Sequence, residues 1–265
     1  MPITAIVHIY NEEYLLPFWI EHHKHFFSNV IFIDYHSTDT SIETIKKLAP
    51  SWEVRITKTT GKWEAKQDDD EVMEIEREVS GFKIALNITD FFIPNKPIDE
   101  ILKDGPVQKL HVFAVCSSNA EDNPTTMNEI IHGIERAQPE IRGYRFLHSH
   151  KDGNYHLGRH DTWHPSVWAN AQIVWLGFYP WNERAIQRKL QFKERLSQSD
   201  INIGAGLQHT WSREEMEQKH LDYIQKLPML ERYPILQKAL QDCYSYSINE
   251  CTGGVYGICG FTSHA

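Results

Sequence analysis

The stretch TAIVHIYNEEYLLPFWIEHHKHFF, residues 4–27, decides the fold, because an apolar run rich in β-branched residues passes directly into a helical pattern. After the apolar run, large side chains recur at the spacing of one helix face: Leu15, Phe18, Trp19, His22 and Phe26. Pro17 fits a helix only if it lies in the first turn. The stretch therefore predicts a strand that ends near Asn11 and a helix that begins shortly after it.

The same rhythm continues through the first ninety residues. The further units are predicted at residues 30–34 (strand), 42–49 (helix, capped by Thr40 or Ser41), 52–60 (strand), 68–80 (helix) and 83–92 (strand). Strand–helix units of this length imply a parallel sheet with right-handed crossovers. We therefore expect the carboxyl ends of the strands to share one edge of the sheet.

Polar residues stand at three of these predicted strand ends. They are Tyr10, Asn11 and Glu12 after the first strand, Asp34 at the second, and Asn87 through Asp90 at the fourth. Ligands of open α/β sheets bind outside the carboxyl ends of the strands. We therefore expect these three groups to converge on one crevice that holds a ligand.

After Pro94 the rhythm weakens. The patterns predict a strand at 107–118, loop and short helix to about 141, a polar turn-rich segment at 148–164, a strand at 171–181, a basic helix at 183–196, and helix at 213–242 with a break at Pro228 and Pro234. The glycine-rich residues 251–265 are expected to form a packed or frayed tail. No internal repeat or low-complexity linker is present, so one domain with two halves is the simplest organisation.

Composition narrows the function. The net charge of −9 over 265 residues argues against general nucleic-acid binding, which needs clustered lysines and arginines. No apolar run is long enough to span a membrane, and the first residues lack the features of a signal peptide. We therefore expect a cytoplasmic protein, possible also at the inner face of the membrane, with its four cysteines reduced.

Several enzyme motifs are missing. The first strand is not followed by Gly-x-Gly-x-x-Gly, and residues 60–63 lack the features of a phosphate-binding P-loop. The sequence Gly-x-Ser-x-Gly does not occur either. These absences disfavour a dinucleotide-dependent dehydrogenase, a P-loop enzyme and a serine hydrolase of the elbow type.

Two motifs resemble those of a known family. Residues 9–13 read IYNEE and residues 34–40 read DYHSTDT, and a polar motif follows the fourth strand. This pattern resembles the GT-A fold glycosyltransferases of the family 2 type, strongly over residues 3–93 and more loosely through residues 177–209. The resemblance implies an α/β, Rossmann-like fold, with a mostly parallel sheet flanked by helices and a C-terminal helical extension.

The resemblance also implies a division of the chain and a donor site. A catalytic domain would cover residues 1–211, with a nucleotide-binding half at 1–95 and an acceptor half at 96–211, and a helical tail would follow at 212–265. The residues expected to bind a nucleotide-sugar are Ile9, Tyr10, Asn11, Glu12, Asp34, Asn87, Thr89, Arg188 and Lys189. The basic pair among them would meet the diphosphate.

This chain departs from the family at the motif that normally holds a divalent cation. Asn87 and Thr89 stand where the family has the two aspartates of Asp-x-Asp, and neutral side chains are poor ligands for Mg²⁺ or Mn²⁺. Three outcomes remain open: a cation bound weakly through Asp90 and His209, replacement of the cation by Arg184, Arg188 and Lys189, or loss of donor binding.

The implied reaction is transfer of the sugar, with inversion, to a glycan, a lipid-linked molecule or another hydroxyl acceptor. Such a reaction needs a general base, and the candidates are Glu183 and Asp161. Two alternatives remain: a catalytically silent glycan-binding or assembly subunit on the same fold, and a metal-dependent hydrolase that uses the histidines between His148 and His164. No nucleic-acid partner is expected, and a homodimer is possible.

Overall fold

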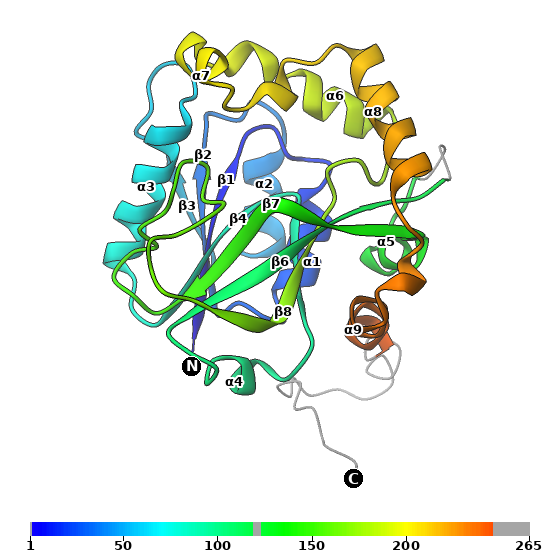
Figure 1. The fold of residues 1–265 in the computed structure, drawn as a ribbon. Helices are drawn as coiled ribbons and strands as arrows, with labels where there is room; N and C mark the ends of the chain where they lie inside the picture. The colour runs from blue at the N-terminus through cyan, green and yellow to red at the C-terminus, as the bar shows by residue number, and fades with distance from the viewer. Residues whose placement is uncertain (1, 119–122, 246–265) are drawn as a thin grey trace.

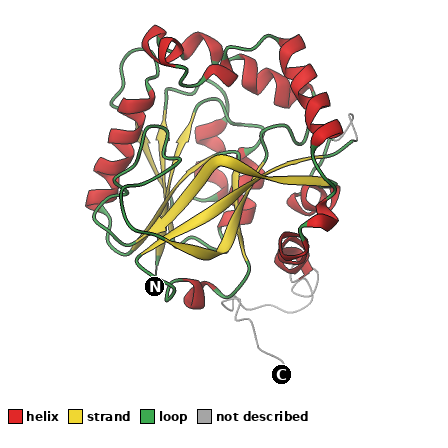
Figure 2. Cartoon of the chain, viewed as in Figure 1, coloured by secondary structure: helices red, strands yellow, loops and turns green. Residues whose placement is uncertain are grey.

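The strand–helix rhythm of the first residues builds one half of a continuous eight-stranded sheet, in the order β3-β2-β1-β4-β7-β6-β8-β5 (Figures 1 and 2). The structure is a computed structural model that describes residues 2–118 and 123–245. Its strands are β1 (Ile3–Ile9), β2 (Asn29–Asp34), β3 (Glu53–Ile56), β4 (Phe82–Asn87), β5 (Asp90–Pro94), β6 (Val107–Cys116), β7 (Arg136–His148) and β8 (Val167–Trp175).

Helices connect and cover these strands. The α-helices of the described residues are α1 (Leu16–His23), α2 (Ser41–Leu48), α3 (Ala65–Glu78), α4 (Ile98–Ile101), α5 (Met127–Gly133), α6 (Glu183–Leu190), α7 (Gln198–Ile203), α8 (Arg213–Lys226) and α9 (Pro234–Ser245). Short 3₁₀ turns are η1 (Lys193–Arg195), η2 (Leu207–His209) and η3 (Leu230–Arg232).

The first half matches the sequence prediction. β1 lies parallel to β2 and β4, and β2 lies parallel to β3. Pro17 occupies the first turn of α1, where its missing N–H leaves no hydrogen bond unmade. The predicted strand–helix units are thus confirmed, although β3 ends at Ile56, earlier than expected, and α3 begins at Ala65.

The two faces of this parallel half are covered by different helices. From β1, Ala5 and Val7 join the large core that contains Trp19 of α1 and Ile45 of α2. Ile6 points to the opposite face, where it joins a second core with Val72 of α3. Each large apolar side chain buried in this way contributes about 1.5–3 kcal/mol. This two-sided burial fixes the height and tilt of the strand ends.

The second half corrects three sequence predictions. The predicted fourth strand is two strands, since the chain turns at residues 87–90 and β5 crosses to pair antiparallel with β8. β7 occupies a region predicted as loop and polar turn, and it pairs antiparallel with β4 and β6. β8 begins at Val167 and ends at Trp175, before the predicted end at residue 181. Pairing across the sheet decides these three elements, and local residue pattern does not reveal it.

Among the neighbouring strand pairs of the described residues, four are parallel and three antiparallel, which confirms the α/β class with a mostly parallel sheet flanked by helices. α8 and α9 confirm the helical C-terminal region with its break at the two prolines. Residues 251–265, predicted as a tail, lie outside the described residues. None of the described helices has the length and apolar character needed to cross a membrane.

One segment is placed where a ligand is expected. α6 and α7 run along the top of Figure 1, above the carboxyl ends of β1 and β2. The predicted basic helix ends at Leu190, and η1 and α7 continue the segment across the sheet edge. The Trp63 N–H donates to the Arg195 carbonyl oxygen at 2.7 Å, and the Ser197 N–H donates to the Trp63 carbonyl oxygen at 3.1 Å. These backbone bonds hold the segment against the loop after β3.

Candidate functional site

Asn11 follows β1 and ties the neighbouring strand end to the covering segment. Its backbone has a positive φ of 51°, a conformation that asparagine tolerates better than most residues. Its Oδ1 accepts a hydrogen bond from the Thr38 N–H at 2.7 Å, and its Nδ2 donates to Gln191 Oε1 at 3.1 Å. The Gln191 Nε2 in turn donates to the Asn11 carbonyl oxygen at 3.0 Å. Asn11 therefore orders the edge of the crevice through its own amide.

Glu12 and Arg188 form a paired unit beside Asn11. The Arg188 guanidinium donates to both carboxylate oxygens of Glu12, and Glu12 is buried. Burial raises the pKa of Glu12, while the charge of Arg188 opposes that effect. The sequence prediction placed both residues at a donor site, and the structure brings them together as an ion pair.

Lys189 is the neighbour of this pair on α6. Its ammonium lies 4.4 Å from the ring centroid of Phe178 and 5.9 Å from that of Trp175. Within residues 2–118 and 123–245 it makes no ion pair. Burial, aided by the charge of Arg188, lowers the pKa of Lys189 to about 7. Lys189 is therefore held against aromatic faces and is only partly charged at neutral pH, and a bound anion would favour its charged form.

Two residues at the end of β2 shape the opposite side of the crevice. Asp34 is buried, and its Oδ1 accepts a hydrogen bond from the Ser37 N–H at 3.0 Å. His36 has a positive φ of 60° in the turn that follows. The family pattern has glycine at that position, and the left-handed backbone explains why. The Tyr35 hydroxyl points to the other side and donates to Asp68 Oδ1 at 3.0 Å.

The predicted nucleoside residues Ile9 and Tyr10 differ in exposure. Ile9 is buried in the large core, and its carbonyl oxygen accepts a hydrogen bond from the Tyr35 N–H at 2.9 Å. Tyr10 is half-buried, and the guanidinium of Arg195 lies 4.3 Å from its ring centroid. A cleft of about 320 Å³ opens beside Arg195; it is lined by Thr60, Gly61, Lys62, Glu194 and Arg195.

The turn between β4 and β5 carries Asn87 and Thr89, which the sequence prediction aligned with a metal motif. Asp90 is fully buried; its Oδ2 accepts hydrogen bonds from the Asn87 N–H at 2.9 Å and from Arg145 Nε at 2.8 Å. The Thr89 carbonyl oxygen accepts from the Leu176 N–H at 2.8 Å, which places this turn next to Trp175 and so next to Lys189. The turn is thus linked to Lys189 through Trp175 and Leu176.

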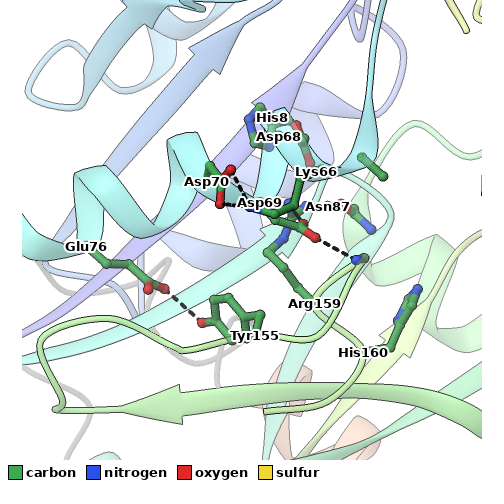
Figure 3. A network of polar contacts seen from close by, with 12 residues as sticks. His8, Lys66, Asp68, Asp69, Asp70, Glu76, Asn87, Tyr155, Arg159 and His160 are labelled. Carbon is green, nitrogen blue, oxygen red and sulfur yellow. Dashed lines mark hydrogen bonds and ion pairs between the residues drawn. The ribbon is translucent and has the colours of Figure 1, made fainter. Parts of the chain in front are cut away.

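A second arginine reaches the turn from the loop between β7 and β8 (Figure 3). Arg159 Nη1 donates to Asp68 Oδ2 at 2.5 Å and to Asp69 Oδ1 at 2.8 Å, and its Nη2 lies 3.5 Å from Asn87 Oδ1. Arg159 has a positive φ of 57°, which is strained for a bulky residue. Both aspartates are buried in the first half of α3.

Neighbouring charges explain why the buried carboxylate of Asp68 stays ionised. Burial by itself would raise the pKa of Asp68, but the charges of His8 and Arg159 outweigh burial and hold that pKa below its usual range. His8 Nε2 lies 2.8 Å from Asp68 Oδ1. For Asp69 burial prevails, and its pKa is raised despite Arg159. The network thus gives Arg159 one fully ionised partner and one weaker one.

Buried Glu76 anchors the same loop farther along α3 (Figure 3). Its Oε1 accepts a hydrogen bond from the Tyr155 hydroxyl at 2.8 Å, and its Oε2 accepts from the Gly153 N–H at 2.6 Å. A Cβ on Gly153 would lie 1.9 Å from the Tyr155 ring, so only glycine fits there. This anchor fixes the loop that carries Arg159.

The two residues predicted as metal ligands do not fit a divalent cation. Asp90 Oδ2 is engaged by Arg145 and by a backbone N–H, whereas Oδ1 is buried without a hydrogen-bond partner among the described residues, so Asp90 offers at most one free oxygen. His209 packs its ring 4.6 Å from Phe192; burial and the charges of Lys189 and Arg188 lower its pKa to about 3. Neighbouring cations repel a metal ion. Within the described residues, no three His, Cys, Asp or Glu side chains gather as a metal site.

The two candidate bases lie in different places. Glu183 begins α6, is exposed, and pairs with Arg213 of α8, with Oε2 2.5 Å from Nη2. The hydrogen bonds from Arg213 and Gln187 lower its pKa to about 2. Asp161 lies in the loop between β7 and β8, and its Oδ1 is 3.7 Å from Lys109 Nζ. Asp161 follows His160, whose Nδ1 is 3.1 Å from Arg145 Nη1.

The histidines of the predicted hydrolase site serve separate contacts. His148 is buried with Glu76, and His150 stacks on His164 with ring centroids 4.3 Å apart. His156 packs against Trp163. Partial burial of the ring and the charge of Arg145 lower the pKa of His160 to about 4. Their placement therefore gives the hydrolase alternative no support.

Sequence reasoning missed His8, Asp68, Asp69, Arg145 and Arg159. Asp68 and Asp69 were interpreted only as an acidic first helical turn. One available signal was the placement of His8 in the otherwise apolar first strand. Arg145 gave no signal because β7 was not predicted, and Arg159 lies in the predicted polar turn-rich segment without any feature that marked it.

Comparison with known proteins gives remote likenesses. Neither a protein-family model nor a curated protein matches this chain. S. aureus TarS 1-349, solved with UDP-GlcNAc, is similar at 15% identity over 56% of this chain and 45% of its own, with a TM-score of 0.36. Glucosyl-3-phosphoglycerate synthase from Mycobacterium tuberculosis, solved with Mn²⁺ and UDP, is similar at 15% identity over 43% of this chain and 44% of its own, with a TM-score of 0.32.

HddC from Yersinia pseudotuberculosis is similar at 9% identity over 66% of this chain and 94% of its own, with a TM-score of 0.37. The chain thus spans less than half the length of the TarS and synthase structures that it matches. None of these likenesses assigns it to a family or to an activity.

Proposed function

We propose that this protein transfers a sugar from a nucleotide-sugar donor of the UDP or GDP type to a glycan or another hydroxyl acceptor, with inversion at the anomeric carbon. The observation that carries the proposal is Lys189, which lies 5.9 Å from the ring centroid of Trp175, the residue before Leu176 that binds Thr89, and makes no ion pair within the described residues. An anionic diphosphate is the natural occupant of such a place.

In this proposal the donor lies along the carboxyl ends of β1, β2 and β4. Asp34 and the backbone at Asn11 would hold the nucleoside, and the diphosphate would lie against Lys189 beside Asn87. A bound diphosphate raises the pKa of a neighbouring lysine, so Lys189 would be charged when the donor is present. No step is assigned to a metal ion, because Asp90 has one oxygen free at most and His209 lies beside the cations Lys189 and Arg188.

The chemistry follows from these positions. The acceptor oxygen would form its bond to the anomeric carbon while the bond between that carbon and the diphosphate oxygen breaks. Lys189 would stabilise the negative charge that develops on the leaving diphosphate. The acceptor proton would pass to Asp161, which is the better placed base because Glu183 is held by Arg213 at the other end of α6.

The first test is thermal unfolding with UDP and with GDP, each with and without Mn²⁺. At about one hundred times its Kd, the correct nucleotide should raise the Tm by roughly 5–10 °C. If no nucleotide changes the Tm in any condition, the proposal is wrong. A shift with Zn²⁺ alone would favour the hydrolase instead.

Matched variants then test the base. Asp161→Asn should lower sugar transfer about 100-fold or more, since an amide cannot take the acceptor proton. Glu183→Gln should leave the rate close to that of the wild type. The rate is measured as release of nucleoside diphosphate from UDP-glucose, UDP-N-acetylglucosamine or GDP-mannose, whichever reacts fastest. The opposite order of effects would assign the role to Glu183.

A further inference from the structure

Three ring side chains meet on the open face of the second half of the sheet. They are His111 of β6, Tyr144 of β7 and Trp168 of β8, and Lys109 and Asp161 lie against them. We call these five residues the aromatic ledge. His111 and Trp168 are exposed, and Lys109 and Tyr144 are half-buried, so the ledge faces solvent.

The rings of the ledge are ordered by one another. His111 and Trp168 are stacked with centroids 4.0 Å apart and planes 8° apart, and the Tyr144 ring lies edge-on to Trp168 at 5.7 Å. Lys109 Nζ lies 3.8 Å from the centroid of Tyr144. Trp168 is nevertheless 54% exposed. A single exposed aromatic residue is ordinary, but three joined rings held at fixed angles on an open strand face form a prepared surface.

The charge of the ledge limits what binds there. Lys109 is balanced by Asp161 at 3.7 Å. Partial burial, aided by the charge of Lys109, lowers the pKa of His111, so its imidazole is neutral at neutral pH and offers both a donor and an acceptor. A surface with no net charge does not favour a phosphate group or an anionic membrane. It suits a neutral ligand with an apolar face and polar edges.

A pyranose ring has that shape. The C–H groups on one face of the ring pack on an aromatic side chain, and the hydroxyl groups around its rim hydrogen-bond to neighbouring polar side chains. In the ledge, Trp168 offers the exposed ring, while His111 and Asp161 offer the polar atoms beside it.

A series of contacts also joins the ledge to the candidate site. Asp161 lies in the ledge, and the residue before it, His160, contacts Arg145 at 3.1 Å. Arg145 in turn donates to Asp90 at 2.8 Å, in the turn that carries Asn87 and Thr89. These contacts pass through the buried side chains of Arg145 and Asp90, so they connect the ledge with the candidate site through the interior of the protein.

We propose that the aromatic ledge binds one sugar ring of the glycan acceptor, stacked on Trp168. The identity of the ligand as an acceptor rests on the proposed transferase function, but binding of a glycan to the ledge does not require a donor. The two proposals are therefore tested separately.

The test measures binding of maltohexaose, cellohexaose and N-acetylchitohexaose to the whole protein, by isothermal titration calorimetry and by tryptophan fluorescence. At least one of them should bind to the wild type. Trp168→Ala should weaken that binding about tenfold, as expected for loss of a stacking ring, and Trp168→Phe should retain part of it. The Kd for UDP or GDP should not change in either variant.

The matched control is Trp163→Ala. Trp163 is 71% exposed and packs on His156 at 4.1 Å, so it is a second exposed tryptophan that leans on a histidine, outside the ledge. Its replacement should leave glycan affinity unchanged. Circular dichroism and Tm establish that each variant is folded.

Two kinds of result would contradict the proposal that the ledge binds a sugar ring. The first is a lack of glycan binding at the ledge: either none of the three oligosaccharides binds the wild type with a Kd of 10 mM or less (a binding free energy of about 3 kcal/mol), or Trp168→Ala binds them as well as the wild type does. The second is that the wild type is a dimer that Trp168→Ala converts to a monomer, which would make the ledge a contact between two copies. Glycan binding without any nucleotide binding would leave the ledge standing and contradict the transferase.

Discussion

Arg159 and Arg188 reach the same edge of the sheet from opposite sides, and their surroundings differ. Arg159 comes from the loop between β7 and β8 and is held by two buried aspartates of α3. Arg188 comes from α6 and is paired with one carboxylate, Glu12, whose pKa is raised by burial. Next to Arg188 stands Lys189, which makes no ion pair within the described residues.

The comparison distinguishes charged side chains that stabilise the fold from one that could bind a ligand. Arg159 neutralises two carboxylates that would otherwise be buried and unpaired. It therefore orders the loop between β7 and β8 and the side chain of Asn87. The Arg188–Glu12 pair closes the other side and leaves the neighbouring ammonium as the charge available to a ligand. Residue type does not distinguish these roles, since burial and the number of partners decide them.

The largest effect is expected from Arg159→Met. The change leaves Asp68 and Asp69 buried without a guanidinium, and it should lower the free energy of unfolding by about 3–5 kcal/mol at pH 7. Because the pKa of Asp68 is depressed in the folded protein, its stabilising effect is present above its unfolded pKa and is lost as the pH falls. The deficit of the variant should therefore be full at pH 7 and shrink only below the unfolded pKa of 3.8, toward about pH 3. Urea unfolding at both pH values measures it.

Arg188→Met is the control for that change. Arg188 neutralises one buried carboxylate, whereas Arg159 neutralises two, so the cost in stability should be at least about 1 kcal/mol smaller. If Arg159→Met and Arg188→Met lost the same free energy of unfolding, the two arginines would not differ in their contribution to stability.

A smaller effect, on binding and not on folding, is expected from Lys189→Met. Loss of one charge-assisted contact to the diphosphate should weaken UDP or GDP affinity roughly 10- to 100-fold. Lys189→Arg should keep most of the nucleotide affinity at pH 7. The affinity of this variant should also fall less between pH 6 and pH 8 than that of the wild type, because arginine stays charged throughout. Calorimetric titration at pH 6, 7 and 8 tests both variants.

The same lysine has a signature in stability. Its folded pKa of about 7 lies below that of a free lysine, so between pH 7 and about 10 the unfolded chain holds more protons and wild-type stability rises with pH. The stability of Lys189→Met lacks this pH dependence. Its free energy of unfolding should therefore exceed that of the wild type most below pH 7. An identical pH slope in both proteins would mean that Lys189 titrates normally.

The smallest effect is expected from the double change Asn87→Asp and Thr89→Asp, which restores the carboxylates of the family motif. Arg159 lies 3.5 Å from Asn87 Oδ1 and should pair with the carboxylate introduced there, so added Mn²⁺ should alter nucleotide affinity by less than about twofold. The readout is the Kd for UDP and GDP with and without Mn²⁺. A clear gain of Mn²⁺ dependence would instead mean that the corner accepts a metal once carboxylates return.

The parallel half of the fold was predictable because its signals are local. Apolar runs, helical spacing and Pro17 placed β1, α1, β2 and α2 correctly, and the predicted parallel pairing put the polar ends of β1, β2 and β4 on one edge. The second half was not predictable in the same way. β7 contains arginines, a proline and a glycine, and it is a strand only because β4 and β6 supply its hydrogen bonds.

The sequence by itself determined the alternation of strands and helices, the convergence of Asn11, Glu12, Asp34 and Asn87 on one edge, and the scarcity of carboxylates for a metal. Only the tertiary structure decided how the charges are shared. It joined Arg188 to Glu12, Arg145 to Asp90 and Arg159 to Asp68. Ion pairing and burial depend on distances between segments far apart in the chain, and such distances exist only once the sheet has formed.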